Sequence, residues 1–266
     1  MTTIGFIGAG NMGAAIMKGI AGSQLSSQVK LFAADPTKEK LAELAAFGVT
    51  PCESAVQLVQ TCKYVFLAVK PQVMEEVLET ISSYVQSETV FISIAAGISG
   101  EFIQKKTRPD AKIALVMPNT PLLLGEGASA LAKVEPITED EFKLVCDIFA
   151  SCGKIAVIPE EKMKEIIPVN GSSPAFIYLF AKGFVEYATA VGLEEETAKA
   201  LFAQSLTGSA KMITDSGYTI DELIKMVSSP GGTTLRGLDE FYAGNLEGVV
   251  KKACESCVRR AYELSK

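Results

Sequence analysis

The chain has 266 residues and a formal net charge of −6, and 48% of its residues are hydrophobic while 21% are charged. This balance is typical of a globular protein with a sizeable core, and the length suffices for two domains of ordinary size. An acidic chain without a basic cluster excludes a nucleic-acid surface. No apolar run approaches the ~20 residues that span a bilayer, and no signal-peptide pattern is visible. We therefore expect a cytoplasmic protein without nucleic-acid or membrane partners.

The chain contains no histidine and six cysteines. Without an imidazole, Ser-His-Asp and Cys-His nucleophile pairs cannot form, and histidine cannot act as a general acid or base. Cys254 and Cys257 form an isolated CxxC that lacks two further ligands for a structural zinc, so we expect no metal. Any chemistry must rely on a cofactor, lysine, carboxylates, hydroxyls or backbone dipoles.

Short apolar runs alternate with helical segments over residues 1–160. Such alternation predicts βαβ units around a buried parallel sheet, and hence an α/β Rossmann-like domain. Runs at residues 128–132 and 155–158 should extend that sheet in mixed orientation. The pattern from Thr138 to Glu141 predicts a capping box at a helix start. The main strands are expected at residues 3–7, 29–33, 64–69, 90–95 and 112–117.

Residues 161–266 show no strand-like runs and instead repeat a helical period to the end, which predicts an all-α C-terminal domain. Pro174 should open a helix that stops near Gly192, and another should span residues 195–217. Thr219 with Glu222 gives a second capping box. The long apolar faces of these helices predict pairing across a subunit boundary, and hence a homo-oligomer.

A glycine-rich motif follows the first expected strand and precedes a helical run. Within it, Gly8 permits the tight turn, Gly10 lets the backbone approach a pyrophosphate, and Gly13 lets the helix pack on the strand. The helix N-terminus offers N–H groups and a positive dipole end to phosphates. The strand–turn–helix context predicts dinucleotide binding. The motif reads Gly8, Ala9, Gly10, Asn11, Met12, Gly13.

Asp35 stands at the end of the second expected strand and has two interpretations. An acid there typically bonds the adenine ribose 2′-hydroxyl of NAD and repels the 2′-phosphate of NADP. Alternatively, Asp35 caps a helix that has Pro36 at its first position. Thr37 and Lys38 can also hold a 2′-phosphate, so the choice between NADH and NADPH stays open.

Three further strand ends should border the cofactor, because ligands of open α/β sheets bind beyond the carboxyl ends of the strands. Small residues there let a flat nicotinamide approach, and prolines stiffen the loop beneath it. Lys70 taken alone is equally consistent with an ordinary loop lysine. The segments are Ala68-Val69-Lys70-Pro71, Ala95-Ala96-Gly97 and Met117-Pro118-Asn119-Thr120-Pro121.

Two loops of the helical half combine hydroxyls, glycine and proline at helix starts. Backbone N–H groups at a helix start suit a carboxylate, whereas the alternative for either loop is simple helix capping. The loops are Gly171-Ser172-Ser173-Pro174-Ala175 and Ser228-Ser229-Pro230-Gly231-Gly232-Thr233-Thr234.

The order GxGxMG, AVKP, AAG, MPNTP, GSSPA, GSAKM and SPGGTT resembles the pyrroline-5-carboxylate reductase family over essentially the whole chain. The last motif is highly specific, since related Rossmann dehydrogenases lack it. The resemblance implies reduction of 1-pyrroline-5-carboxylate to L-proline by NADPH or NADH, and a helical domain intertwined with another subunit. It also implies an active site between the cofactor domain and the helices. The matching residues are 8–13, 68–71, 95–97, 117–121, 171–175, 208–212 and 229–234.

The resemblance also implies residue roles. The N–H groups of Gly231, Gly232 and Thr233 would hold the substrate carboxylate, beside a loop containing Ser172 and Ser173. The Thr234 hydroxyl would bond the imine nitrogen, Ser229 would shape the loop, and Asn119 or Thr120 would position the nicotinamide. Two residues depart from the family pattern: Asn170 replaces a serine, and Asp35 replaces the hydroxyl or basic residue expected of an NADPH-preferring member, which favours NADH.

Two other functions stay open. A β-hydroxyacid dehydrogenase also joins a GxGxMG domain to a helical domain and typically uses a lysine, for which Lys182 and Lys211 are the candidates, although neither lies in a matching motif. A non-catalytic nucleotide sensor would keep the Rossmann domain but has no need of the Ser229–Thr234 loop.

Overall fold

The computed structural model describes residues 1–264 and divides into two compact units. The first contains Met1–Pro174 together with the end of the chain from Ser256, and the second contains Ala175–Glu255. This differs from the expected boundary at residues 160 and 161. The difference arises because Met163 and Ile167 are buried in the core of the first unit, as is Ala261 near the end of the chain.

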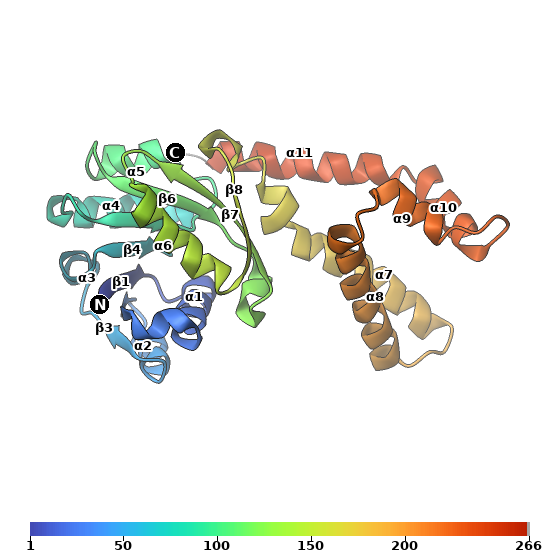
Figure 1. Ribbon diagram of the computed structural model, residues 1–266, viewed down its shortest axis with the longest axis horizontal. Coiled ribbons are helices and arrows are strands. Elements are labelled where there is room, and N and C mark those ends of the chain that lie inside the picture. The colour runs from blue at the N-terminus through green and yellow to red at the C-terminus, as the bar shows by residue number, and fades with distance from the viewer. Residues whose placement is uncertain (265–266) are drawn as a thin grey trace. The chain divides into compact units, whose positions relative to one another are not determined.

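The first unit contains an eight-stranded sheet in the order β3-β2-β1-β4-β5-β6-β7-β8 (Figure 1). Neighbouring strands are parallel except for β6 and β7, which are antiparallel, so the mixed orientation predicted for the last two strands is confirmed. The strands are β1 Thr2–Ile7, β2 Val29–Ala34, β3 Val49–Pro51, β4 Tyr64–Leu67, β5 Val90–Ser93, β6 Lys112–Met117, β7 Gly127–Val134 and β8 Gly153–Val157.

Sequence reasoning located the five main strands but extended β4 and β5 two residues too far and missed β3. The extra residues, Ala68, Val69, Ile94 and Ala95, belong to the loops that follow these two strands at the sheet edge. β3 is three residues long with two exposed, so it lacks the apolar run that marks the other strands.

Helices cover both faces of this sheet, because strand residues alternate between two apolar clusters. In β1, Ile4 and Phe6 belong to one cluster while Ile7 belongs to the other. Phe6 stacks on Phe66 of β4 with ring centroids 4.2 Å apart. One face is covered by α1 Asn11–Gly22, α2 Lys38–Ala45 and α6 Glu139–Ala150, and the other by α3 Ala55–Thr61, α4 Met74–Ile81 and α5 Gly100–Lys106.

Both predicted capping boxes are confirmed. At the start of α6, the Thr138 hydroxyl accepts the N–H of Glu141 at 3.3 Å, and the Glu141 carboxylate accepts the N–H of Thr138 at 3.1 Å. Thr219 and Glu222 repeat the arrangement at the start of α9. Each pair satisfies two N–H groups that a helix start otherwise leaves without partners.

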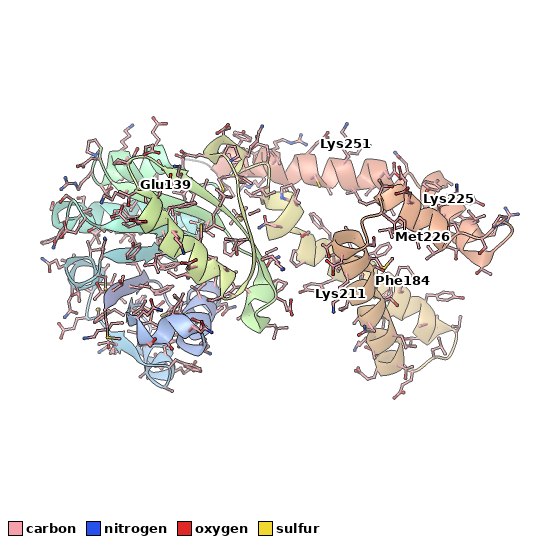
Figure 2. All side chains as sticks on the ribbon, in the orientation of Figure 1. Glu139, Phe184, Lys211, Lys225, Met226 and Lys251 are labelled. Carbon is pink, nitrogen blue, oxygen red and sulfur yellow. The ribbon has the colours of Figure 1, made fainter. Side chains whose placement is uncertain are left out.

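The second unit consists of helices, as predicted, but it buries almost nothing by itself. Of residues 175–255, only Ala188 is buried. Aromatic rings of α7, α8 and α10 contact one another, and Phe184 stacks on Phe202 with centroids 4.4 Å apart (Figure 2). The helices are α7 Ser173–Ala190, α8 Glu195–Asp215, α9 Ile220–Met226, α10 Thr233–Ala243 and α11 Leu246–Leu264, of which α11 ends in the first unit.

Candidate active site

The turn between β1 and α1 requires glycine at two positions. Gly8 has a φ of +103°, and a methyl group there would lie 2.6 Å from the carbonyl oxygen of Ala68 at the end of β4. A methyl group at Gly13 would lie 2.7 Å from the carbonyl oxygen of Gly8. These two glycines therefore let the turn close against the neighbouring strand end, as the motif predicts.

Gly10 is different, because the fold does not demand it. Its φ is −71°, and a methyl group there would meet no atom within 4 Å. It precedes α1 without any side-chain capping hydrogen bond, so the first N–H groups of α1 face open space at the positive end of the helix. Asn11 and Met12 belong to this first turn. The space and the donors fit the pyrophosphate of a dinucleotide.

Asp35 links the second strand to this turn. Its carboxylate accepts the N–H of Ala9 at 2.7 Å and the N–H of Thr37 at 2.9 Å, and Lys40 Nζ lies 3.6 Å away. Burial alone would raise the pKa of Asp35, but these hydrogen bonds and the lysine together hold it below its ordinary value. Asp35 is therefore a fixed anion beside the Gly8–Gly13 turn.

The helix-capping interpretation of Asp35 is wrong. Helix α2 begins at Lys38, and Thr37 occupies its N-cap position. Pro36 therefore lies outside the helix rather than at its first position. Each oxygen of Asp35 accepts a single backbone N–H, and a carboxylate oxygen can accept more than one hydrogen bond. Recognition of a ribose hydroxyl stays a prediction that this geometry permits.

The end of β4 lies against the glycine turn, at the position where the strand order reverses between β1 and β4. This switch point is where open α/β sheets bind ligands. Ala68 and Val69 both lie near Gly8, whereas Lys70 is exposed and precedes a short helical turn that begins at Pro71. These four residues stay predicted cofactor contacts.

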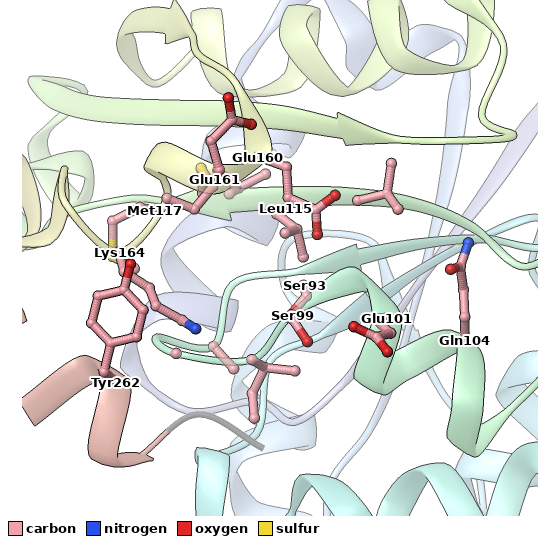
Figure 3. Close-up of a pocket in the computed structure, with 16 residues that line it drawn as sticks. Ser93, Ser99, Glu101, Gln104, Leu115, Met117, Glu160, Glu161, Lys164 and Tyr262 are labelled. Atoms are coloured by element: carbon pink, nitrogen blue, oxygen red, sulfur yellow. The ribbon is translucent and has the colours of Figure 1, made fainter.

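The loop after β5 is covered by the end of α11. Gly97 has a φ of +82°, and a methyl group there would lie 3.2 Å from the carbonyl oxygen of Ala261. Ala95, two residues earlier, lines a cavity of about 520 Å³ on the α5 side of the sheet (Figure 3). Its role as a cofactor contact stays a prediction.

Tyr262 fixes the end of α11 beside this cavity (Figure 3). Its hydroxyl donates to Glu165 Oε1 at 2.7 Å, and Lys164 Nζ lies 4.5 Å from the centre of its ring. The hydrogen bond holds the pKa of Glu165 below its ordinary value. Sequence reasoning missed this contact, since the two residues are 97 positions apart.

Asn119 was predicted to position the nicotinamide, but its side chain is buried and engaged within the protein. Its Oδ1 accepts the N–H of Ala128 at 2.9 Å, and its Nδ2 donates to the carbonyl oxygen of Asn170 at 3.2 Å. Any influence of Asn119 on a cofactor therefore passes through the loop that it anchors. Asn170 is also buried and bonds the ends of β6 and β7, a role that sequence reasoning did not anticipate.

The Gly171–Ala175 segment begins α7 beside these two residues. The Ser173 hydroxyl donates to the carbonyl oxygen of Asn170 at 3.4 Å, and the N–H of Ser172 donates to the carbonyl oxygen of Ile167 at 2.8 Å. The Ser172 hydroxyl makes no hydrogen bond to another residue between 1 and 264. It is the hydroxyl of this segment that could contact a ligand without breaking an existing bond.

The Ser229–Thr234 loop of the second unit forms a tight turn. The N–H of Gly232 donates to the carbonyl oxygen of Ser229 at 2.9 Å, with Pro230 and Gly231 between them and a φ of +73° at Gly231. Proline followed by a positive-φ glycine is typical of a type II turn. Gly232 was predicted to donate its N–H to a carboxylate, but in this structure that N–H is engaged in the turn.

Thr233 and Thr234 form the first turn of α10. Gly232 at the N-cap position has no side chain to satisfy the helix start, so the N–H groups of this turn lack intrahelical partners. Both threonines are exposed, and the Thr234 hydroxyl bonds no other residue in the described part of the chain. The geometry fits the predicted carboxylate site. Three N–H donors were predicted there, and because the N–H of Gly232 is engaged in the turn, those of Gly231 and Thr233 remain.

The lysines considered for a hydroxyacid dehydrogenase lie on exposed helix faces. Lys182 Nζ is 3.5 Å from Glu186 one helical turn away, and Lys211 is exposed on α8 (Figure 2). Within residues 1–264, no group of three or more metal-binding side chains comes together. No helix in the same range is long and apolar enough to cross a membrane.

Comparison with protein families gives two matches. The model described as pyrroline-5-carboxylate reductase dimerisation matches residues 160–264, which include both loops of the helical half. The model described as NADP oxidoreductase, coenzyme F420-dependent, matches residues 3–97, which include the glycine turn and Asp35.

Individual relatives match over the full length. The pyrroline-5-carboxylate reductase of Escherichia coli (strain K12) is 34% identical over 266 residues, or 99% of this chain and 98% of its own. The structure of Plasmodium falciparum pyrroline carboxylate reductase with NADP bound is 30% identical, with a TM-score of 0.91 over 100% of this chain and 98% of its own. The Coxiella burnetii pyrroline-5-carboxylate reductase structure is 30% identical, with a TM-score of 0.89 over 100% of this chain and 99% of its own.

Proposed function

This chain belongs to the pyrroline-5-carboxylate reductase family, and we propose that it reduces 1-pyrroline-5-carboxylate to L-proline with NADH or NADPH. The observation that carries the proposal is the full-length match to the E. coli reductase, because it includes both the Gly8–Gly13 turn and the Ser229–Thr234 loop. A nucleotide-binding domain alone would match only the first of these. The match over the Ser229–Thr234 loop favours a reductase, because a nucleotide sensor has no need of a substrate-binding loop.

A bound nicotinamide cofactor supplies the hydride for the ring carbon of the C=N bond. The N–H groups at the start of α1 hold the pyrophosphate next to Gly10, where the backbone has no side chain in the way. Asp35, at the end of β2, would bond the adenine ribose. The Ala68–Pro71 and Ala95–Gly97 loops would border the nicotinamide half. In this proposal the protein orients the cofactor, and the hydride chemistry belongs to the cofactor.

The helical unit binds the substrate. The N–H groups of Gly231 and Thr233, at the positive end of α10, bind the substrate carboxylate. The Thr234 hydroxyl bonds the ring nitrogen, which keeps the proton that it carries as an iminium and becomes the amine of proline. Because a protonated imine is already electrophilic, the reaction needs orientation more than acid catalysis. A chain without histidine can therefore perform it.

The protein acts as a homo-oligomer assembled through the helical unit. A groove of about 790 Å³ in that unit is lined by Phe176, Phe180, Phe184, Phe241 and other apolar residues. Exposure of such an apolar surface to water is unfavourable, and a second copy of the same face covers it.

The six cysteines form no disulfide, which supports the reducing environment of the cytoplasm as the location of the protein.

The direct test is consumption of NADH or NADPH on addition of 1-pyrroline-5-carboxylate, with proline identified as the product. Thr234→Ala should lower kcat/KM about 10²-fold, the effect of removing one well-placed hydrogen-bonding group at the reacting centre. Thr189→Ala on α7 serves as the matched control, because its hydroxyl bonds only the backbone of its own helix. Unchanged turnover in Thr234→Ala would remove that residue from the mechanism.

The same assay separates the alternatives. Oxidation of a β-hydroxyacid, without reduction of the cyclic imine, would replace the proposed function with that of a hydroxyacid dehydrogenase. Tight cofactor binding without turnover of either substrate would indicate a sensor.

A further inference from the structure

Two side-chain amides tie the antiparallel pair β6 and β7 at its opposite ends. At the carboxyl end of β6, Asn170 Nδ2 donates to the carbonyl oxygens of Met117 at 2.6 Å and Ala128 at 3.0 Å. At the other end, Gln104 Nε2 donates to the carbonyl oxygens of Ala111 at 3.1 Å and Glu135 at 2.8 Å. The two amides do the same structural task, but only Asn170 lies at the edge where the sheet would bind a ligand.

Asn170 also connects this strand pair to the start of α7. Its own carbonyl oxygen accepts Asn119 Nδ2 at 3.2 Å and the Ser173 hydroxyl at 3.4 Å. Asn119 in turn accepts the N–H of Ala128 at 2.9 Å. Three segments are thereby joined by one buried network: the loop after β6, the start of β7, and the Gly171–Ala175 segment. We call Asn119, Ala128, Asn170 and Ser173, together with the hydrogen bonds that Asn119 and Asn170 make, the Asn170 network.

The network leaves one buried atom without a partner. Asn170 Oδ1 is inaccessible to solvent and has no hydrogen-bond donor among the described residues. A buried acceptor without a donor is unfavourable, so asparagine is not the residue that stability alone would select. A serine at this position, the residue of the family pattern, has one hydroxyl proton and cannot donate to Met117 and Ala128 at once.

We infer that Asn170 is a positioning residue for hydride transfer, holding the loop after β6 and the start of α7 in one fixed geometry. The inference rests on the proposed function. It follows from location: the loop after β6 leaves the sheet edge on which the nicotinamide half is expected, Asn170 bonds the Gly171–Ala175 segment to that edge, and both segments carry predicted site residues. Hydride transfer depends steeply on donor–acceptor geometry, and a displacement of about 1 Å lowers rates about 10²-fold.

The test compares Asn170→Ser with Gln104→Ser, which removes the equivalent tie from the far end of the same strands. Both variants should lower Tm by similar amounts. Asn170→Ser alone should lower kcat about tenfold or more, while the Kd for the reduced cofactor, measured by its fluorescence, changes less than threefold. With cofactor deuterated at both C4 positions, the kinetic isotope effect on kcat should rise in Asn170→Ser and stay at the wild-type value in Gln104→Ser.

Equal kcat and equal isotope effects in the two variants would overturn the inference, because Asn170 would then only stabilise the fold. If Asn170→Ser does not fold, Asn119→Ser removes the two side-chain bonds of Asn119, to Asn170 and to Ala128, while the two bonds of Asn170 to β6 and β7 stay in place. It should show the same pattern to a lesser degree. A wild-type isotope effect in a folded Asn119→Ser would equally overturn it. Failure of the wild-type enzyme to reduce the imine would instead contradict the proposed function.

Discussion

The two units of this chain differ in how much of their apolar surface they cover by themselves. In the α/β unit, both faces of the sheet are packed under helices, and rings such as Phe6, Phe66 and Phe91 are fully buried. In the helical unit, Ala188 alone is buried, while Leu179 is 71% exposed and Tyr187 is 69% exposed. The first unit has a hydrophobic core of its own. The apolar residues of the second unit become buried only when another protein surface covers them.

The two units bury their apolar residues in different ways. The strands of the α/β unit place apolar residues on alternate faces, and helices of the same chain cover both. The helices of the second unit carry apolar residues around much of their circumference, which is typical of helices buried on several sides. Because a single copy does not bury them, we expect most of the stability of this unit to come from the oligomer.

The largest effect should come from a charge on the exposed apolar face. Leu179→Arg would be nearly neutral in a monomer, since exposed substitutions stay within about 0.5 kcal/mol. Beneath a second copy it buries an unpaired charge, and we expect a loss of about 3 kcal/mol or more together with dissociation. Light scattering after size exclusion measures the mass, and thermal unfolding at several protein concentrations measures the stability.

Val157→Arg is the matched control for that variant. Val157 is a similarly exposed apolar residue, on strand β8 of the α/β unit. It should leave both mass and Tm unchanged. An unchanged mass and Tm in Leu179→Arg would show that the oligomer does not cover the apolar face of the helical unit at Leu179.

A smaller effect should distinguish folding from binding within the α/β unit. Gly8→Ala combines a left-handed backbone angle with a methyl group 2.6 Å from a carbonyl oxygen, and should lower the free energy of unfolding by about 2–3 kcal/mol. Gly10→Ala meets no atom within 4 Å, so the free energy of unfolding should change by less than about 0.5 kcal/mol. Its Kd for the cofactor should nevertheless rise about tenfold, because the methyl group occupies the space proposed for the pyrophosphate.

Thermal unfolding and a fluorescence titration with NADH or NADPH measure the two effects separately. Wild-type affinity in Gly10→Ala would contradict the proposed pyrophosphate position without bearing on the fold.

The smallest effect should appear at Asp35, whose carboxylate accepts two backbone N–H groups of the fold and is proposed to bond the adenine ribose. Asp35→Asn removes a fixed negative charge and one of the two accepted N–H bonds but keeps the shape of the side chain. We expect the ratio of kcat/KM for NADH to that for NADPH to fall about tenfold, because the 2′-phosphate no longer meets an anion. An unchanged ratio would limit Asp35 to its bonds with Ala9 and Thr37.

Most of the fold could be predicted from local pattern, and the site only in part. Capping boxes at Thr138 and Thr219 locate helix starts from four residues each, because the bonds are local. The sequence left the helix-capping interpretation of Asp35 open, because only the structure shows that α2 begins after Thr37. The Asn170 network joins Asn170 to Ala128, Asn119 and Met117, which lie 42, 51 and 53 positions away, and no local pattern reports such pairs. The long apolar faces of the helices predicted that a single copy of the helical unit leaves much of its apolar surface exposed.

The contact between Gly97 and the carbonyl of Ala261 also imposes an order on how the protein is made. One loop of the α/β unit is closed by residues that follow the whole helical unit along the chain. At roughly 5–20 residues per second, the whole helical unit is synthesised in the interval, over several seconds. Until those residues are made the β5 loop is uncovered, so the α/β unit reaches its final form only after the helical unit has been synthesised.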